Sequence, residues 1–142
     1  MPAAMNTIAE DLDALAEDFD LLEDWQEQLG YVIDLGRALP RLAQDERNDA
    51  NKVRGCASQV WLVSERTDDG RLVFRAESDA QIPHGLIAVL LKLYSGRTPA
   101  EIRALDPQAA VDRLKLGSML TSQRANGLAA MVERIRREAA AD

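Results

Sequence analysis

The first forty residues alternate apolar and polar positions with the period of an α-helix. A capping box at Thr7–Glu10 opens the first helix, and a second helix begins at Asp24. The pattern ends at Leu39-Pro40, because proline cannot continue a helix. We expect these apolar positions to face the core: Ile8, Leu12, Leu15, Phe19 and Leu22 in the first segment, and Trp25, Leu29, Val32 and Ile33 in the second.

The pattern changes to that of β-strands in the middle of the chain. Residues 41–52 are polar and lack periodicity, which indicates a loop. Residues 59–66 are rich in β-branched and aromatic side chains, residues 71–76 alternate polar and apolar, and the turn signal Asp68-Asp69-Gly70 lies between them. We predict one antiparallel hairpin here, with a short third strand through Val53 at its leading edge.

Helical periodicity returns at Ile82 and continues toward the C-terminus. Thr98-Pro99 and Asp106-Pro107 each combine a capping residue with a proline at the first helical position, and Thr121 or Ser122 caps the last helix. The order of helices, hairpin and helices predicts a single α+β domain. In this fold class a small antiparallel sheet of about three strands packs with several helices.

Charge is spread unevenly over the 142 residues. The net charge is −7, yet residues 1–24 hold eight acids and no Lys or Arg, whereas residues 25–142 hold 16 acids and 17 bases. We therefore distinguish an acidic N-terminal helical segment, 1–24, from the main part of the domain, 25–142. The acids form a solvated helix face or, alternatively, a docking surface for a basic partner.

Composition excludes several classes of protein. An acidic chain whose only basic cluster is Arg134, Arg136 and Arg137 is a poor match for nucleic acid. No apolar run reaches the roughly 18 residues of a membrane helix, and the acidic start has no basic n-region of a secretory signal. A single cysteine forms no internal disulfide and fits the reducing cytoplasm, so we expect a cytoplasmic protein.

Cofactor sites are equally hard to build from these residues. One Cys and one His supply too few nitrogen and sulfur ligands for a zinc or iron–sulfur site. The glycines Gly30, Gly36, Gly55 and Gly70 are isolated, so no phosphate-binding loop is present. We expect no bound cofactor and no metal.

Cys56 is the one candidate nucleophile, in the stretch VRGCASQVW. A free cysteine is most often a buried structural residue. Its neighbour Gly55 is small, however, and an extended backbone over residues 52–56 would place Lys52, Arg54 and Cys56 on one side. Two cations there would favour the reactive thiolate, unless both are merely solvated charges of an edge strand.

His84 and Asp79 are the other titratable residues that the sequence singles out. His84 follows Pro83 at a helix start, where it is either a surface histidine or a general base that pairs with Cys56 in a thiol hydrolase. Asp79 precedes the same helix and is a candidate cap or hinge carboxylate. Spacing along the chain does not decide between these roles.

The chain resembles the SufE/CsdE family of sulfur-acceptor proteins. The resemblance covers most of residues 25–137, in the family's order. Its most specific elements are Gly-Cys-x-Ser-Gln-Val-Trp at 55–61 and the Leu-Thr-x-x-Arg-x-x-Gly-Leu start of the last helix. Departures are small, with Ala57 and Ser122 where members often have Gln and Pro. The matching stretches are YVIDLGRALP (31–40), RGCASQVWL (54–62), SDAQIPHGLIAVLLKLYSGRTPAEI (78–102) and LTSQRANGLAAMVERI (120–135).

The resemblance implies a sulfur carrier and activator with no turnover of its own. Members take the outer sulfur of a persulfide from a PLP-dependent cysteine desulfurase, SufS-like or CsdA-like, and pass it to iron–sulfur scaffold proteins. Cys56 is then the acceptor, tucked toward an apolar pocket in the free protein. The implied fold is similar to that of IscU-type scaffolds, in agreement with the helix–hairpin–helix order.

Several neighbours are implied to support Cys56 or to contact the partner. Ser58 and Gln59 donate hydrogen bonds to the thiolate or shape the loop, and Arg124 is a counter-ion of the thiolate or pairs with a carboxylate. The remaining supporting positions are Arg54, Gly55, Asp79 and His84. Two alternatives remain open, namely a Cys56/His84 thiol hydrolase and a non-covalent adaptor of a desulfurase.

Overall fold

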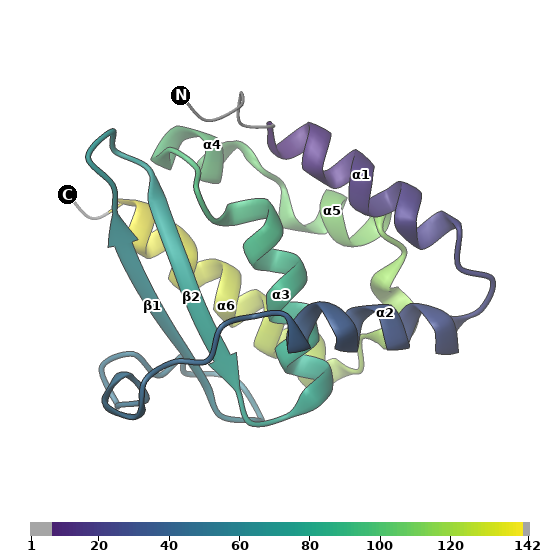
Figure 1. Ribbon diagram of the computed structural model, residues 1–142, viewed down its shortest axis with the longest axis horizontal. Helices are drawn as coiled ribbons and strands as arrows, with labels where there is room; N and C mark the ends of the chain where they lie inside the picture. Colours follow the sequence, from purple (N-terminus) through teal and green to yellow (C-terminus); the bar gives the residue numbers. More distant parts are fainter. Residues whose placement is uncertain (1–6, 141–142) are drawn as a thin grey trace.

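The protein is an α+β domain in which helices surround one β-hairpin, described here from a computed structural model over residues 7–140. Figure 1 shows the hairpin at one side, helix α3 in the middle and the other helices around it. The elements are α1 (Ile8–Asp20), α2 (Trp25–Arg37), a 3₁₀ turn (Gln44–Glu46), β1 (Val60–Arg66), β2 (Leu72–Ser78), α3 (Gln81–Tyr94), α4 (Pro99–Ala104), α5 (Pro107–Arg113), a second 3₁₀ turn (Leu116–Met119) and α6 (Ser122–Ala140).

The helix starts follow the capping signals of the sequence. Thr7 and Thr98 form complete capping boxes, and Asp24 and Asp106 accept hydrogen bonds from backbone amides of α2 and α5. The Thr121 hydroxyl accepts from the backbone amide of Arg124 at 3.2 Å, so Thr121 caps α6. These contacts satisfy amides that the first turn of a helix leaves without partners.

The sheet has two strands, and the prediction of about three strands was therefore slightly wrong. β1 and β2 pair antiparallel from Val60 opposite Ser78 to Arg66 opposite Leu72, and the turn places Gly70 at φ +84°. Where the third strand was expected, a single bridge joins Lys52 to Trp61. The chain leaves this pairing at Arg54 and Gly55, where it turns.

Helix α3 is the centre of the core. Its run from Gly85 to Leu91 is continuously buried, and α1, α2, α6 and β2 all contact it (Figure 1). α2 approaches it very closely, because a Cβ placed on Gly85 would lie only 2.4 Å from the carbonyl oxygen of Val32. Glycine at this crossing lets two backbones meet where any larger residue would clash.

Helix α1 belongs to the same core. Leu15 and Phe19 are buried in the same hydrophobic cluster as α3, as the apolar periodicity predicted, and Ala16 is buried beside them. Some acids of α1 meet bases of the chain itself: Asp13 lies 3.2 Å from Arg113 and Asp20 lies 3.5 Å from Lys115. The acidic face is thus partly neutralised within the molecule.

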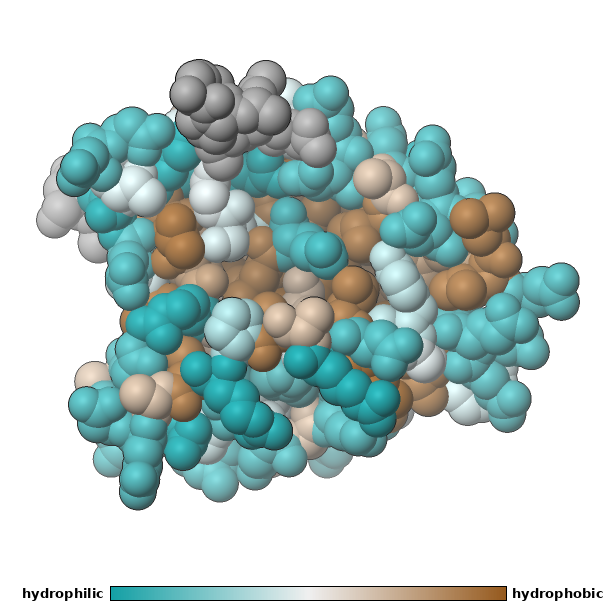
Figure 2. All heavy atoms as spheres, viewed as in Figure 1, coloured by the Kyte–Doolittle hydropathy of each residue, from teal (hydrophilic) through white to brown (hydrophobic). Residues whose placement is uncertain are grey.

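The described surface on the face in Figure 2 is mainly hydrophilic, with hydrophobic atoms between the elements and at the end where α1 turns into α2. Leu21 is 80% exposed in that turn, and Trp25 is 55% exposed at the first position of α2. The expectation that Trp25 faces the core was wrong, because the helix begins at this residue and its side chain projects beyond the packed turns. No helix among the described residues is long and apolar enough to cross a membrane.

Candidate functional site around Cys56

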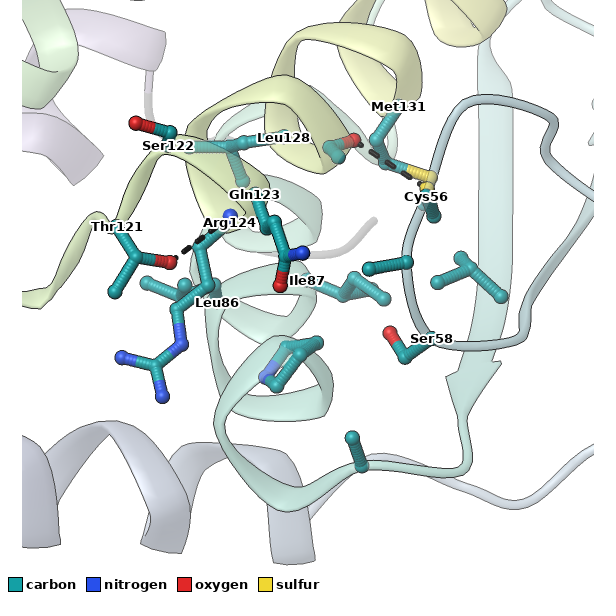
Figure 3. Close-up of a pocket in the computed structure, with 15 residues that line it drawn as sticks. Cys56, Ser58, Leu86, Ile87, Thr121, Ser122, Gln123, Arg124, Leu128 and Met131 are labelled. Atoms are coloured by element: carbon teal, nitrogen blue, oxygen red, sulfur yellow. Dashed lines mark hydrogen bonds between the residues drawn. The ribbon is translucent and has the colours of Figure 1, made fainter.

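Cys56 lies in the loop between the Lys52 bridge and β1, against the first turns of α6 (Figure 3). Its side chain is half-buried, and its thiol donates to the backbone carbonyl of Gly127 across 3.6 Å. A Cβ at residue 127 would lie 3.5 Å from Sγ, an ordinary van der Waals distance, so the thiol packs directly against this turn of the helix. Burial raises the pKa of Cys56 above its ordinary value.

The thiol faces a pocket of about 510 Å³ between the loop, the start of α3 and the start of α6 (Figure 3). Apolar side chains from all three elements form much of its wall, and polar groups line the rest. The apolar wall disfavours an anion, so the neutral thiol is the resting form. The apolar residues include Val60, Pro83, Leu86, Ile87, Leu128 and Met131, and the polar residues are Ser58, Thr121, Ser122, Gln123 and Arg124.

The backbone between Lys52 and Cys56 is not extended, so the predicted alignment of two cations with the thiol was wrong. Val53 is buried and donates its amide to the Val60 carbonyl at 2.8 Å. Gly55 then takes φ +93°, a left-handed conformation that breaks the alternation of an extended strand. Arg54 is exposed and makes no hydrogen bond or ion pair to any described residue.

Asp79 and Gln59 hold the loop on its other side. An oxygen of the Asp79 carboxylate accepts from the Gln59 backbone amide at 3.0 Å, and the Asp79 amide donates back to the Gln59 carbonyl at 3.2 Å. Of the two roles that the sequence left open for Asp79, helix cap or hinge carboxylate, the cap does not apply, because Ala80 occupies the N-cap of α3. The carboxylate instead ends the hairpin beside the loop that carries Cys56.

Ser58 and Gln59 shape the loop in this structure and do not donate to Cys56. The Ser58 hydroxyl accepts from the Ser78 hydroxyl at 3.4 Å, and the Gln59 side-chain amide donates to Asp79 at 3.5 Å. Of the two roles that the sequence left open for this pair, the loop-shaping one matches these contacts.

His84 does not meet Cys56. Its Nδ1 accepts from the Ser78 backbone amide at 3.1 Å, and its ring packs where α2 crosses α3, 3.1 Å from the position of a Cβ on Gly36. Among the described residues it makes no hydrogen bond to the thiol, and it does not line the pocket. Of the two roles that the sequence left open for His84, the geometry therefore disfavours the Cys56/His84 dyad, which needs a ring nitrogen within reach of the sulfur.

Arg124 lines the pocket but does not pair with the sulfur. Its guanidinium donates to the Met119 carbonyl at 3.0 Å and points away from Cys56 (Figure 3). Arg124 therefore contacts neither of the partners that the sequence suggested, a thiolate or a carboxylate. Its hydrogen bond connects α6 to the preceding 3₁₀ turn instead.

Two parts of the site were missed by sequence reasoning. One is Gly127, although it lies inside the Leu-Thr-x-x-Arg-x-x-Gly-Leu element, and a glycine early in a helix is a signal for close backbone approach. The other is the pocket wall formed by Leu86, Ile87 and Met131, because helical periodicity does not show which apolar side chains face a cavity. Among the described residues no group of three or more His, Cys, Asp or Glu side chains could hold a metal ion.

Comparison with known proteins decides the family. A model of the SufE domain, described as an Fe–S metabolism associated domain, matches residues 13–139. The chain belongs to the SufE family. Membership confirms the resemblance seen in the sequence and places this protein in Fe–S metabolism.

Relatives of the same family match nearly the whole chain. An uncharacterized SufE-like protein of Rhizobium etli is 46% identical over 142 residues, covering 98% of this chain and 96% of its own length. A second, from Rhizobium meliloti, is 44% identical over 131 residues, covering 90% of this chain and 94% of its own. The chain thus corresponds to nearly the full length of both relatives.

A solved structure shares the fold. The solution structure of a hypothetical protein from Thermus thermophilus superposes with a TM-score of 0.72, covering 92% of this chain and 96% of that chain. Sequence identity is 16%, so this likeness concerns the fold alone and carries no residue-level conclusion.

Proposed function

We propose that this SufE family protein accepts sulfur on Cys56 from a PLP-dependent cysteine desulfurase and carries it as a persulfide toward iron–sulfur cluster assembly. The observation that carries the proposal is the placement of the chain's single thiol on a loop, half-buried over an apolar pocket. Family membership supplies the context of Fe–S metabolism. The protein itself then acts as a carrier and activator.

The transfer is a thiol exchange without net oxidation. The Cys56 thiolate attacks the outer sulfur of the desulfurase persulfide, the sulfur–sulfur bond breaks, and the desulfurase cysteine leaves as a thiolate that takes up the proton released by Cys56. Attack on the inner sulfur would instead form a mixed disulfide between the two proteins. Access to the outer sulfur therefore matters as much as the thiolate fraction.

The pocket can accommodate both the free thiol before sulfur transfer and the persulfide after it. Apolar walls keep the resting thiol neutral, and a neutral thiol resists both alkylation and oxidation. The cavity of about 510 Å³ exceeds the volume of a thiol and leaves room for one further sulfur atom. Having no second cysteine in the chain also protects the product, because no internal thiol can resolve the persulfide into a disulfide.

Docking of the desulfurase must bring the thiol out of the pocket. Contact with water or with polar groups of the partner then lowers the pKa of Cys56 toward its ordinary value and creates the nucleophile. Loops supply such reach because few buried contacts hold them. Arg54 lies exposed two residues before Cys56 and is a candidate contact with the partner.

Stimulation of a desulfurase tests this proposal. We expect the wild-type protein to raise the rate of alanine formation from cysteine by a SufS-like or CsdA-like desulfurase, and Cys56→Ser to abolish the increase. Alanine is the readout because it reports turnover whichever acceptor takes the sulfur. Full stimulation by Cys56→Ala would contradict sulfur acceptance and would support a non-covalent adaptor.

A further inference from the structure

The segment that leads to Cys56 pairs with β1 along one edge only. Asn51 accepts from the Leu62 amide at 2.8 Å, and Val53 donates to the Val60 carbonyl at 2.8 Å. Because backbone groups alternate in direction along a strand, the Lys52 carbonyl points away from β1. A third full strand would need a partner on that outer edge.

Arg134 of α6 is the partner on that edge. Its guanidinium donates to the Lys52 carbonyl at 3.2 Å and to the Ala50 carbonyl at 2.9 Å. The side chain is 19% exposed; its bond to Lys52 is partly buried, and its bond to Ala50 lies at the exposed surface. Planar guanidinium fits two neighbouring oxygens in a way that a lysine ammonium does not.

The segment that leads to Cys56 lies against one face of α6. Gly127, Ala130 and Arg134 are spaced by three and four residues, so they lie on the same side of the helix. Gly127 accepts from the thiol, and a Cβ on Gly55 would lie 3.3 Å from that of Ala130. Small residues thus let the loop lie against the helix, and Arg134 holds its other end.

Few polar contacts secure this docking. Among the described residues, three hydrogen bonds join residues 50–56 to α6, namely two from Arg134 and the one from the thiol to Gly127. The thiol is a weak donor, so most of the polar attachment comes from Arg134. Glu138 supports the guanidinium, with 3.9 Å between Nε and the carboxylate, and in turn accepts from the Ser64 hydroxyl of β1 at 2.5 Å.

We propose that Arg134 is a latch that holds the Cys56 loop on α6 and sets how often the thiol leaves its pocket. It is a positioning residue, since it binds the backbone carbonyls of Lys52 and Ala50, which lie four and six residues before Cys56. The importance of the latch for sulfur acceptance rests on the function proposed above, whereas the latch itself is a property of the free protein. Release of the latch moves the loop toward the exposed state that a desulfurase requires.

Alkylation of Cys56 by iodoacetamide in the free protein tests the latch. We expect Arg134→Gln to raise the alkylation rate at neutral pH by about ten-fold, the shift in loop population that the loss of two charge-assisted hydrogen bonds implies. Arg134→Lys should fall between Arg134→Gln and the wild type. Arg137→Gln is the matched control, because it removes the same charge from an exposed position of the same helix and should leave the rate unchanged.

The pH profile of the same reaction separates a latch from a simple charge effect. Loss of a nearby cation alone would raise the pKa of Cys56 and slow alkylation, whereas release of the loop from an apolar pocket lowers that pKa and speeds it. We expect the apparent pKa of Arg134→Gln to be below that of the wild type. An unchanged or higher pKa, or an unchanged or slower rate, would overturn the proposal.

A second control excludes general destabilisation. Phe19→Leu removes buried contacts of α1, which Figure 1 places away from the segment before β1, so it lowers the thermal midpoint and should leave alkylation of Cys56 slow. If Phe19→Leu speeds alkylation as much as Arg134→Gln does, the latch is refuted. No desulfurase or persulfide enters this experiment, so its failure would leave the proposed function standing, and failure of sulfur acceptance would leave the latch standing.

Discussion

Cys56 sits in surroundings that favour its neutral thiol, unlike the cysteines that enzymes activate in place. Reactive cysteines usually have a cation or a helix N-terminus beside them that lowers the pKa. Here burial raises the pKa, the thiol donates to a carbonyl, Arg54 is exposed, and Arg124 donates to the Met119 carbonyl. The reactive form must therefore come from movement of the loop and from the partner.

The pH dependence of alkylation tests this state of the thiol. We expect the rate for the native wild-type protein to rise with pH around a midpoint above that of the same cysteine in urea, because desolvation disfavours the thiolate only while the pocket is intact. The fraction of protein that iodoacetamide has alkylated, measured by intact mass at each pH, gives both profiles. A native midpoint at or below the unfolded one would contradict a tucked thiol.

At the residue scale the sequence selects single residues more readily than it pairs distant ones, and the role of Cys56 stays a prediction. Cys56 was selected because it is the only cysteine. The sequence left two interpretations of His84 open, because spacing along the chain does not show that its Nδ1 accepts from the Ser78 amide. The partner of the thiol, Gly127, lies 71 residues away in sequence.

At the scale of elements, helix starts could be predicted because their causes are local. Thr7, Asp24, Thr98, Asp106 and Thr121 each cap the helix that follows within a few residues. The third strand could not be predicted correctly. Its outer edge is filled by a side chain from α6, and no local pattern near Val53 carries that information.

The crossing of α2 and α3 positions the pocket and can be tested with two glycines. Gly85→Ala places a Cβ 2.4 Å from the Val32 carbonyl oxygen, and we expect a loss of about 2–3 kcal/mol in the free energy of unfolding from overpacking. Gly30→Ala on α2 is the matched control, since nothing lies within 4 Å of its Cβ, and it should stabilise by about 0.5–1 kcal/mol. Urea denaturation measures both; equal effects would refute the close crossing.

At the scale of the whole molecule, a buried arginine connects helix α1 to the rest of the domain. Arg97 is 3% exposed, donates to the Leu93 carbonyl at 2.9 Å, and pairs with the Asp11 carboxylate of α1. The sequence distinguishes residues 1–24 as an acidic segment, because a charge pattern shows the sign of the charges but not which residues they pair with. The packing of α1 on the common core makes a solvated, partly paired face the interpretation that best fits the contacts.

Substitution of Arg97 tests how strongly this end contributes to stability. We expect Arg97→Met to lower the free energy of unfolding by about 2–4 kcal/mol, because the Asp11 carboxylate and the Leu93 carbonyl lose their partner. The exposed Arg103 of α4 provides the control, and Arg103→Met should change stability by less than about 0.5 kcal/mol. Equal urea midpoints for the two variants would contradict the anchoring role of Arg97.

The central claim at the scale of the whole molecule is that one sulfur atom moves onto Cys56 from a partner. The most direct measurement is the intact mass of the protein after incubation with a cysteine desulfurase and cysteine, without reductant. We predict a gain of one or more sulfur masses, mapped to the peptide that contains Cys56, returned to the original mass by dithiothreitol and absent in Cys56→Ser. An unmodified wild-type protein, or the same gain in Cys56→Ser, would contradict the account.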